Sequence, residues 1–120
     1  MLAKNLIVGA VMTLGASGCL VRASEAMTYS EWTTADKSFQ KGYVFGIAES
    51  LMNLTDSENQ KSLERTIGYN RCFGENKMTS ETTFHVVISY LFRTPDAATT
   101  PMTANILRAL SEACKSYVPE

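Results

Sequence analysis

The chain has 120 residues, a formal net charge of −1, one histidine and three cysteines. A chain of this length builds one small domain. Its lysines and arginines form no run and do not alternate with aromatic residues, which argues against nucleic acid as a partner, because phosphate neutralisation needs clustered cations. The single histidine excludes metal sites and catalytic triads that need more than one.

Residues 1–26 have the order of an export signal. Lys4 supplies the positive charge, residues 6–14 are almost wholly apolar, and small residues follow, with cleavage expected after Ala23 or Ala26. The apolar stretch is shorter than the roughly 20 residues that span a membrane, and no other segment approaches that length. The sequence therefore predicts a periplasmic or secreted protein without a membrane span.

A second cleavage, before Cys19, stays open. Residues 16–19 read Ala-Ser-Gly-Cys, which resembles the lipobox of bacterial lipoproteins, in which the cysteine is lipidated and anchors the chain. Ala16 stands where the lipobox has Leu, so a soluble domain is favoured over a lipid anchor at Cys19. Under either cleavage Cys72 and Cys114 remain together in an oxidising compartment, and this even pair implies one disulfide.

Residues 27–120 are predicted to form a single domain with about four helices. The first helix is predicted over residues 34–52, with Thr33 as its N-cap. Its apolar residues recur at every fourth position: Phe39, Tyr43, Ile47 and Leu51. Gly42 and Gly46 lie beside this stripe. Because each lowers helix propensity by about 1 kcal/mol relative to alanine, they predict close approach of another helix.

The second helix is predicted to begin at a capping box formed by Thr55 and Glu58. Only two apolar residues follow at helical spacing, Leu63 and Ile67. We therefore expect a surface helix, which Gly68 would end. Residues 69–78 are predicted to form a polar loop.

The third helix is predicted to begin with Thr79 or Ser80 as N-cap. Glu81 lies in its first turn, where the helix dipole stabilises a negative charge. Its apolar stripe has the spacing i, i+3, i+4 and i+7: Phe84, Val87, Ile88 and Leu91. The helix should end near Thr94, because Pro95 cannot continue the hydrogen-bond ladder.

The fourth helix is predicted to have Thr100 as N-cap and Pro101 at its first position. Its expected inner face consists of Met102, Ile106, Leu107, Leu110, Ala113, Cys114 and Tyr117. A bond from Cys114 to Cys72 would join the end of this helix to the predicted loop. In the chain-entropy model such a bond stabilises the folded state by about 4 kcal/mol. The predicted fold is all-α, a small bundle of about four helices stapled by one disulfide.

No residue pattern in the chain indicates catalysis. His85 stands alone on a predicted helix, and we interpret it as structural. The serines and threonines gather at predicted helix caps, where backbone hydrogen bonding explains them. The chain has no Gly-x-Ser-x-Gly elbow, phosphate-binding glycine loop or Cys-x-x-Cys pair. The sequence thus predicts a protein that is not an enzyme and has no catalytic, cofactor-binding or metal-binding residues.

Three segments together resemble the Rap1a/Tai family of immunity proteins. Residues 39–48, FQKGYVFGIA, resemble the family's GY-x-x-G helix. Residues 78–95 resemble its helix that ends in YL-x-x-x-P, and residues 106–114 resemble its final helix, which ends in a cysteine. The resemblance implies a small periplasmic helical protein that binds a peptidoglycan amidase toxin delivered by a type VI secretion system. Inhibition would then occur by occlusion of the toxin's active-site groove.

The residue types in the predicted loop suggest one binding surface, composed of Tyr69, Asn70, Arg71 and Phe73. Tyrosine, arginine and phenylalanine are typical interface anchors, and a neighbouring disulfide would hold them in place. The alternative interpretation is that Tyr69 and Phe73 cover the edge of the core.

Two other functions stay open, a small periplasmic stress chaperone and another non-enzymatic periplasmic binding protein. Such chaperones are also helical, exported and held by one disulfide, and they expose apolar surface at low pH. A single histidine and a modest charge provide few groups for an acid switch near pH 5 to 6. Monomer and homodimer are both compatible with the sequence.

Overall fold

The computed structural model of the chain describes residues 26–53 and 59–119. These residues form five α-helices and one 3-10 helix, with no strand among them, and Cys72 is bonded to Cys114. The prediction of an all-α fold stapled by one disulfide is confirmed. The export signal, Cys19 and the predicted capping box at residues 55–58 lie outside the described residues.

The predicted first helix corresponds to α3 (Lys37–Asn53), and a separate short helix, α2 (Tyr29–Thr34), precedes it. The prediction of Thr33 as an N-cap was therefore wrong. Thr28 caps α2 in a capping box with Glu31. The Asp36 carboxylate accepts from the backbone N–H of Phe39 at 2.9 Å and so begins α3. Two capping signals eight residues apart explain the break.

The buried face of α3 contains Val44 and Ala48, both fully buried. Phe39, the first residue of the predicted stripe, is 44% exposed. The other three, Tyr43, Ile47 and Leu51, pack against the core, so the stripe borders an inner face that is centred one position further along. A Cβ at Gly42 or Gly46 would meet no atom within 4 Å. The prediction that these two glycines allow close approach of another helix was wrong.

The second helix, α4 (Gln60–Glu75), begins at Asn59 and extends well beyond Gly68. The predictions that Gly68 ends this helix and that residues 69–78 form a polar loop were both wrong. Tyr69, Cys72 and Phe73 are buried, and their spacing places them on one face of α4. Burial of this face against the rest of the domain continues the helix through a polar stretch of sequence.

The third helix, α5 (Ser80–Phe92), agrees with its prediction. Thr79 is the N-cap, and its hydroxyl accepts from the backbone N–H of Thr82 at 3.2 Å. Phe84 and Val87 are buried, while Ile88 and Leu91 are half-buried. The chain then enters the 3-10 helix η1 (Pro95–Thr99).

The last helix is α6 (Met102–Ala113), and its N-cap is Pro101. Thr100, the predicted cap, instead donates its hydroxyl to the Asp96 carbonyl at 2.9 Å. Met102, Ile106, Leu110 and the C-cap Cys114 are fully buried, as predicted. Two residues assigned to the inner face are exposed, Leu107 and Ala113.

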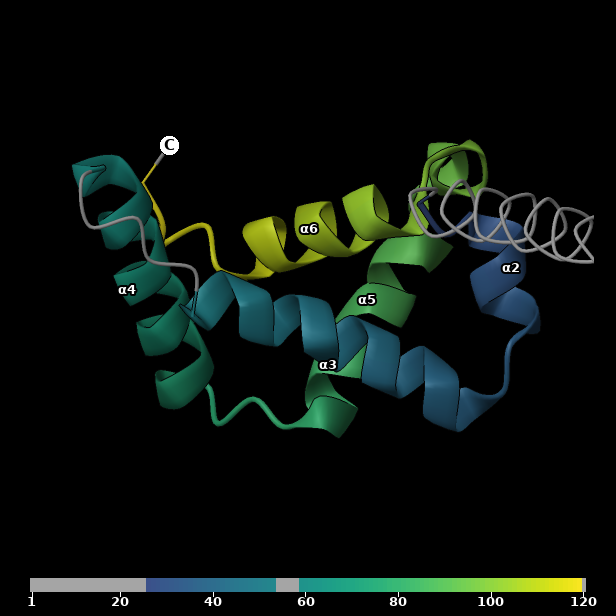
Figure 1. Cartoon of the computed structure of the whole chain (residues 1–120), viewed down its shortest axis with the longest axis horizontal. Helices are drawn as coiled ribbons and strands as arrows, with labels where there is room; N and C mark the ends of the chain where they lie inside the picture. Colours follow the sequence, from purple (N-terminus) through teal and green to yellow (C-terminus); the bar gives the residue numbers. More distant parts are fainter. Residues whose placement is uncertain (1–25, 54–58, 120) are drawn as a thin grey trace, which may run out of the picture.

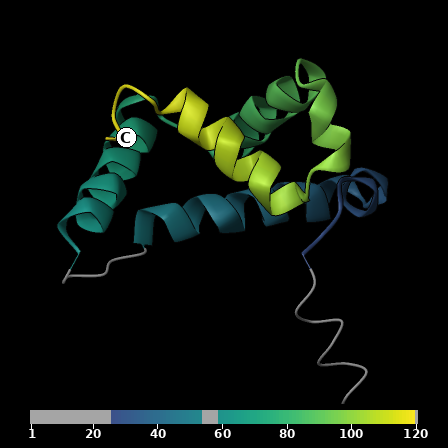
Figure 2. The same ribbon diagram turned by 90° about the horizontal axis from the view of Figure 1, so that it is seen from above.

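The helices α3, α5 and α6 contact one another and form the centre of the domain (Figure 1). The helix α4 lies at one end, where it contacts α3, and α2 lies at the other end beside η1 (Figure 2). The disulfide joins α4 to the end of α6, with a Cα–Cα distance of 5.7 Å between Cys72 and Cys114. One core therefore holds helices from both ends of the molecule.

Candidate protein-binding surfaces

The four residues predicted to bind a partner do not share one surface. Tyr69 and Phe73 are only 4% and 5% exposed and belong to the core. Asn70 is exposed, but its side chain donates to the Met52 carbonyl at 2.9 Å and thereby ends α3. Arg71 is exposed beside Glu75 on the same helix. Because this segment is a helix, Tyr69 and Phe73 lie on the face that covers the core, while Asn70 and Arg71 lie on the exposed face.

A groove without charged lining residues lies between α2, α3 and α5, and we call it the aromatic groove. Its volume is about 390 Å³, and its lining residues are Tyr29, Trp32, Thr33, Gln40, Ile88, Leu91 and Phe92. Pockets of this size and apolar character are typical of binding sites.

Phe92, at the end of α5, is 90% exposed at the edge of this groove. Full burial of such a side chain is worth about 2 kcal/mol relative to exposure. The next residue, Arg93, forms an ion pair with Glu112 of α6, and its guanidinium lies 5.8 Å from the ring centroid of Tyr90. Phe92 is thus an exposed aromatic residue at a helix end that the contacts of Arg93 hold in place. Interface anchors typically have these properties.

The walls of the aromatic groove are joined by reciprocal hydrogen bonds. The Trp32 indole N–H donates to the Gln40 carbonyl at 3.3 Å, and the Gln40 side chain donates to the Trp32 carbonyl at 2.9 Å. Trp32 is 1% exposed, and its ring centroid lies 6.0 Å from that of Phe84 on α5. These contacts hold α2 and α3 together at the base of the groove.

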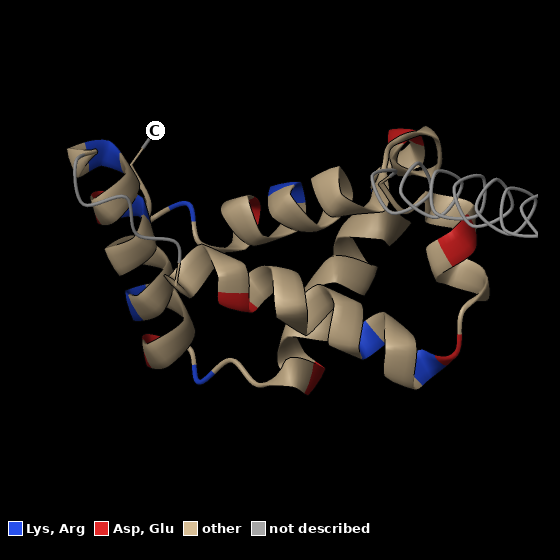
Figure 3. Ribbon diagram, viewed as in Figure 1, with Lys and Arg blue, Asp and Glu red and all other residues tan. Residues whose placement is uncertain are grey.

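A second groove lies between the end of α3, α4 and α6, and we call it the basic groove. Its volume is about 560 Å³, and its lining residues are Leu51, Arg65, Tyr69, Leu107, Arg108, Ser111, Glu112 and Lys115. Figure 3 shows positive segments on α4, on α6 and in the segment that follows α6. The lining of this groove combines apolar side chains, Leu51 and Leu107, which we call its floor, with charged side chains.

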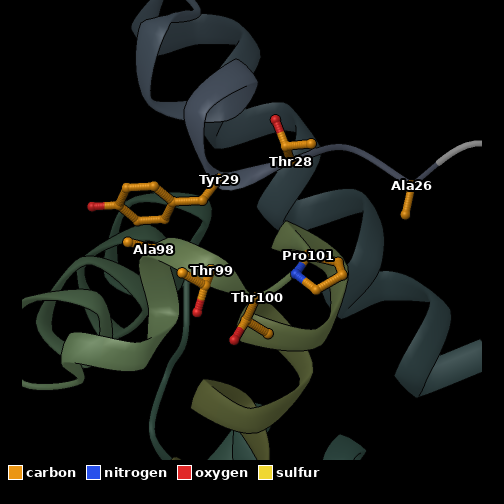
Figure 4. Close-up of a pocket in the computed structure, with 7 residues that line it drawn as sticks. All are labelled: Ala26, Thr28, Tyr29, Ala98, Thr99, Thr100 and Pro101. Carbon is orange, nitrogen blue, oxygen red and sulfur yellow. The ribbon is translucent and has the colours of Figure 1, made fainter.

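A smaller pocket of about 220 Å³ lies between the start of α2 and η1 (Figure 4). Its threonine hydroxyls are engaged locally. The Thr28 hydroxyl caps α2, and the hydroxyls of Thr99 and Thr100 both donate to the Asp96 carbonyl. The Met27 carbonyl accepts from the first amide of α6, at Met102, at 2.8 Å. These threonine hydroxyls therefore serve backbone capping.

His85 belongs to an exposed ion-pair cluster at the start of α5. Its Nε2 lies 3.3 Å from the Glu81 carboxylate, which also pairs with Lys41 of α3. The hydrogen bond from Lys41 lowers the pKa of Glu81 below its ordinary value of 4.5, and the nearby His85 acts in the same direction. The cluster links α3 to α5 at the surface.

The sequence reasoning missed both grooves. Phe92 lies directly after Leu91 and so outside the predicted stripe of α5, and the basic groove is lined by residues of helices that are far apart in the chain.

Within the described residues, no group of three or more His, Cys, Asp or Glu is placed to hold a metal ion. No helix in residues 26–53 or 59–119 is long and apolar enough to cross a membrane. Comparison of the chain with models of protein families, with curated proteins and with solved structures finds no match.

Proposed function

We propose that this chain is an exported immunity protein that binds a type VI secretion amidase toxin and occludes its active site. The observation that carries the proposal is Phe92, which is 90% exposed beside the aromatic groove. The resemblance of residues 39–48, 78–95 and 106–114 to the Rap1a/Tai family supports the same role. Export would place the protein beside the cell wall, where such a toxin acts.

Occlusion needs a surface that fits a cleft and keeps its shape on binding. Phe92 would enter an apolar part of the toxin's groove, while the aromatic groove would receive a side chain from the toxin. The reciprocal bonds between Trp32 and Gln40 hold the groove before the partner arrives. A surface that is already ordered loses little conformational entropy on binding, which favours high affinity.

The first experiment uses the purified mature domain, residues 27–120 with the disulfide intact. It measures inhibition of a peptidoglycan amidase, chosen from the genes that neighbour the gene for this chain. We expect inhibition and a dissociation constant in the nanomolar range. If the domain neither binds nor inhibits that amidase at micromolar concentration, the proposal fails for that toxin.

The second experiment assigns the surface. Phe92→Ala should weaken binding by about tenfold or more, because it removes the exposed anchor. Phe39→Ala is the matched control, since Phe39 is another partly exposed aromatic, on α3 outside the lining of the aromatic groove. Equal losses in both variants would rule out the aromatic groove as the specific surface.

A third measurement separates the proposal from a stress chaperone. Binding of an apolar dye and protection of an unfolded client are followed as the pH falls. An immunity protein should show unchanged dye binding and no client protection. Strong dye binding below about pH 4 together with client protection would favour the chaperone.

A further inference from the structure

We infer that the basic groove is a second docking surface, which binds an acidic, amphipathic polypeptide segment. Three cations border it, Arg65 on α4, Arg108 on α6 and Lys115 just after α6. Leu51 and Leu107 provide apolar surface in the same groove. This inference goes beyond the proposed function, because it does not require the partner to be an amidase.

The charge of the groove supports an acidic occupant. Among the described residues, Arg65, Arg108 and Lys115 take part in no ion pair. Glu112 is the one acidic residue in the described lining, and its carboxylate is already paired with Arg93. Three uncompensated positive charges therefore gather on a chain whose formal net charge is −1. Such a local field attracts a negatively charged partner.

The floor of the groove favours an amphipathic occupant over a simple anion. Leu107 is 38% exposed and Leu51 is half-buried. A free phosphate or a purely acidic chain would leave this apolar surface in water. A segment that carries carboxylates and an apolar side chain would cover the floor and pair with the cations together.

The two helices that line the basic groove, α4 and α6, are connected by the disulfide. Tyr69 lies one turn before Cys72 on α4, while Ser111 and Lys115 flank Cys114 at the end of α6. The disulfide thus joins the two walls covalently. The separation of the α4 and α6 backbones at this point is therefore set before any partner binds, which limits the entropy lost on docking.

The basic groove is separate from the aromatic groove. It lies at the end of the molecule that contains α4, whereas the aromatic groove lies towards α2 (Figure 1). The two surfaces have no lining residue in common. Substitutions in one groove can therefore be tested without removal of a residue from the other.

The experiment uses the isotopically labelled, disulfide-bonded mature domain and a synthetic amphipathic peptide of glutamate and leucine. Amide chemical shifts should move around Leu51, Arg65, Leu107 and Arg108. The peptide with lysine in place of glutamate should not bind, and polyglutamate should bind more weakly than the amphipathic peptide. Binding should weaken as the salt concentration rises. An absence of shifts, or shifts confined to the aromatic groove, would overturn the inference.

Charge reversal provides the matched comparison. Arg108→Glu alone should weaken peptide binding, and Arg65→Glu combined with Arg108→Glu should weaken it by about tenfold or more. Lys37→Glu changes one charge on an exposed residue at the start of α3 and should have little effect. Leu107→Ala should weaken binding without any change in charge. If Lys37→Glu is as damaging as a single reversal in the groove, attraction to the whole molecule explains the binding and the inference is wrong.

A last arm tests the nature of the occupant. Vesicles that contain phosphatidylglycerol are added in place of the peptide. We expect little binding, because a lipid headgroup would leave the apolar floor uncovered. Vesicle binding stronger than peptide binding, lost in the same Arg65 and Arg108 variant, would assign the groove to anionic lipid and overturn the polypeptide assignment.

Discussion

Gly68 of α4 lies directly against the backbone of Tyr117, in the segment that follows α6. A Cβ at Gly68 would overlap the Tyr117 carbonyl and would come within 3.2 Å of the Val118 Cα. The guanidinium of Arg71, one turn further along α4, lies 5.8 Å from the ring centroid of Tyr117. The last residues of the chain therefore cross α4 at a position where only glycine fits.

Gly68→Ala should destabilise the domain. Alanine would raise helix propensity by about 1 kcal/mol, but its methyl group would push against a backbone carbonyl that cannot rotate away. Overpacking of this kind costs about 1–3 kcal/mol. The free energy of unfolding, measured by urea denaturation, should fall, and amide exchange should become faster in the segment around Tyr117.

Two other helical glycines provide the control for this substitution. A Cβ at Gly42 or Gly46 of α3 would meet no atom within 4 Å. Gly42→Ala and Gly46→Ala should therefore stabilise the domain by about 0.5–1 kcal/mol each, through helix propensity alone. If Gly68→Ala is as stabilising as these two, the close approach of Gly68 to Tyr117 does not affect the free energy of unfolding.

Reduction of the bond between Cys72 and Cys114 should remove a large share of the stability. The bond spans a sequence separation of 42 residues. A loop of that length corresponds to about 4 kcal/mol in the chain-entropy model, against about 5–15 kcal/mol for the total stability of a typical domain. The urea midpoint should fall strongly when a thiol reductant is added.

A double variant serves as the control for reduction. Cys72→Ala with Cys114→Ala should unfold at a low urea concentration and should not respond to the reductant. Both cysteines are buried, at 2% and 0% exposure. Equal midpoints for the oxidised and reduced proteins would show that packing alone holds α4 against α6.

Glu81 should contribute a small acid-dependent part of the stability. Its hydrogen bond from Lys41 lowers its pKa in the folded protein below the ordinary 4.5. Since the folded protein holds the carboxylate in its charged form, this stabilisation is present above about pH 4.5 and is lost as the pH falls through the lowered pKa. Urea denaturation between pH 6 and pH 3 should show a slope that is smaller in Glu81→Gln.

Glu49→Gln is the matched control for this pH dependence. Glu49 is exposed on α3 and forms no ion pair among the described residues. Its substitution should leave the acid slope close to that of the unchanged protein. An identical slope in Glu81→Gln and the unchanged protein would show that the Lys41 contact is too exposed to affect folding.

The helix α5 could be predicted closely because its signals are local. Thr79 caps its start, an apolar stripe follows at helical spacing, and Pro95 stops its continuation. The helix α4 could not be predicted in the same way. Asn70, Arg71 and Gly74 suggest a loop when read locally, yet burial of the opposite face continues the helix to Glu75.

The candidate surfaces were not predictable from residue types. Tyr69 and Phe92 are both aromatic residues on helices, but one is 4% exposed and the other 90%. Only the packing of neighbouring helices distinguishes them. The basic groove depends in the same way on the fold, because Arg65 of α4, Arg108 of α6 and Lys115 line one groove only when the chain is folded.

The amino-acid sequence alone was sufficient for the all-α class, the pairing of Cys72 with Cys114 and the start of α5, because caps, periodicity and cysteine number are local or compositional signals. The length of α4, the true inner face of α3 and both grooves became visible only in the folded chain. Those features depend on burial between segments distant in sequence, and no single segment carries that information.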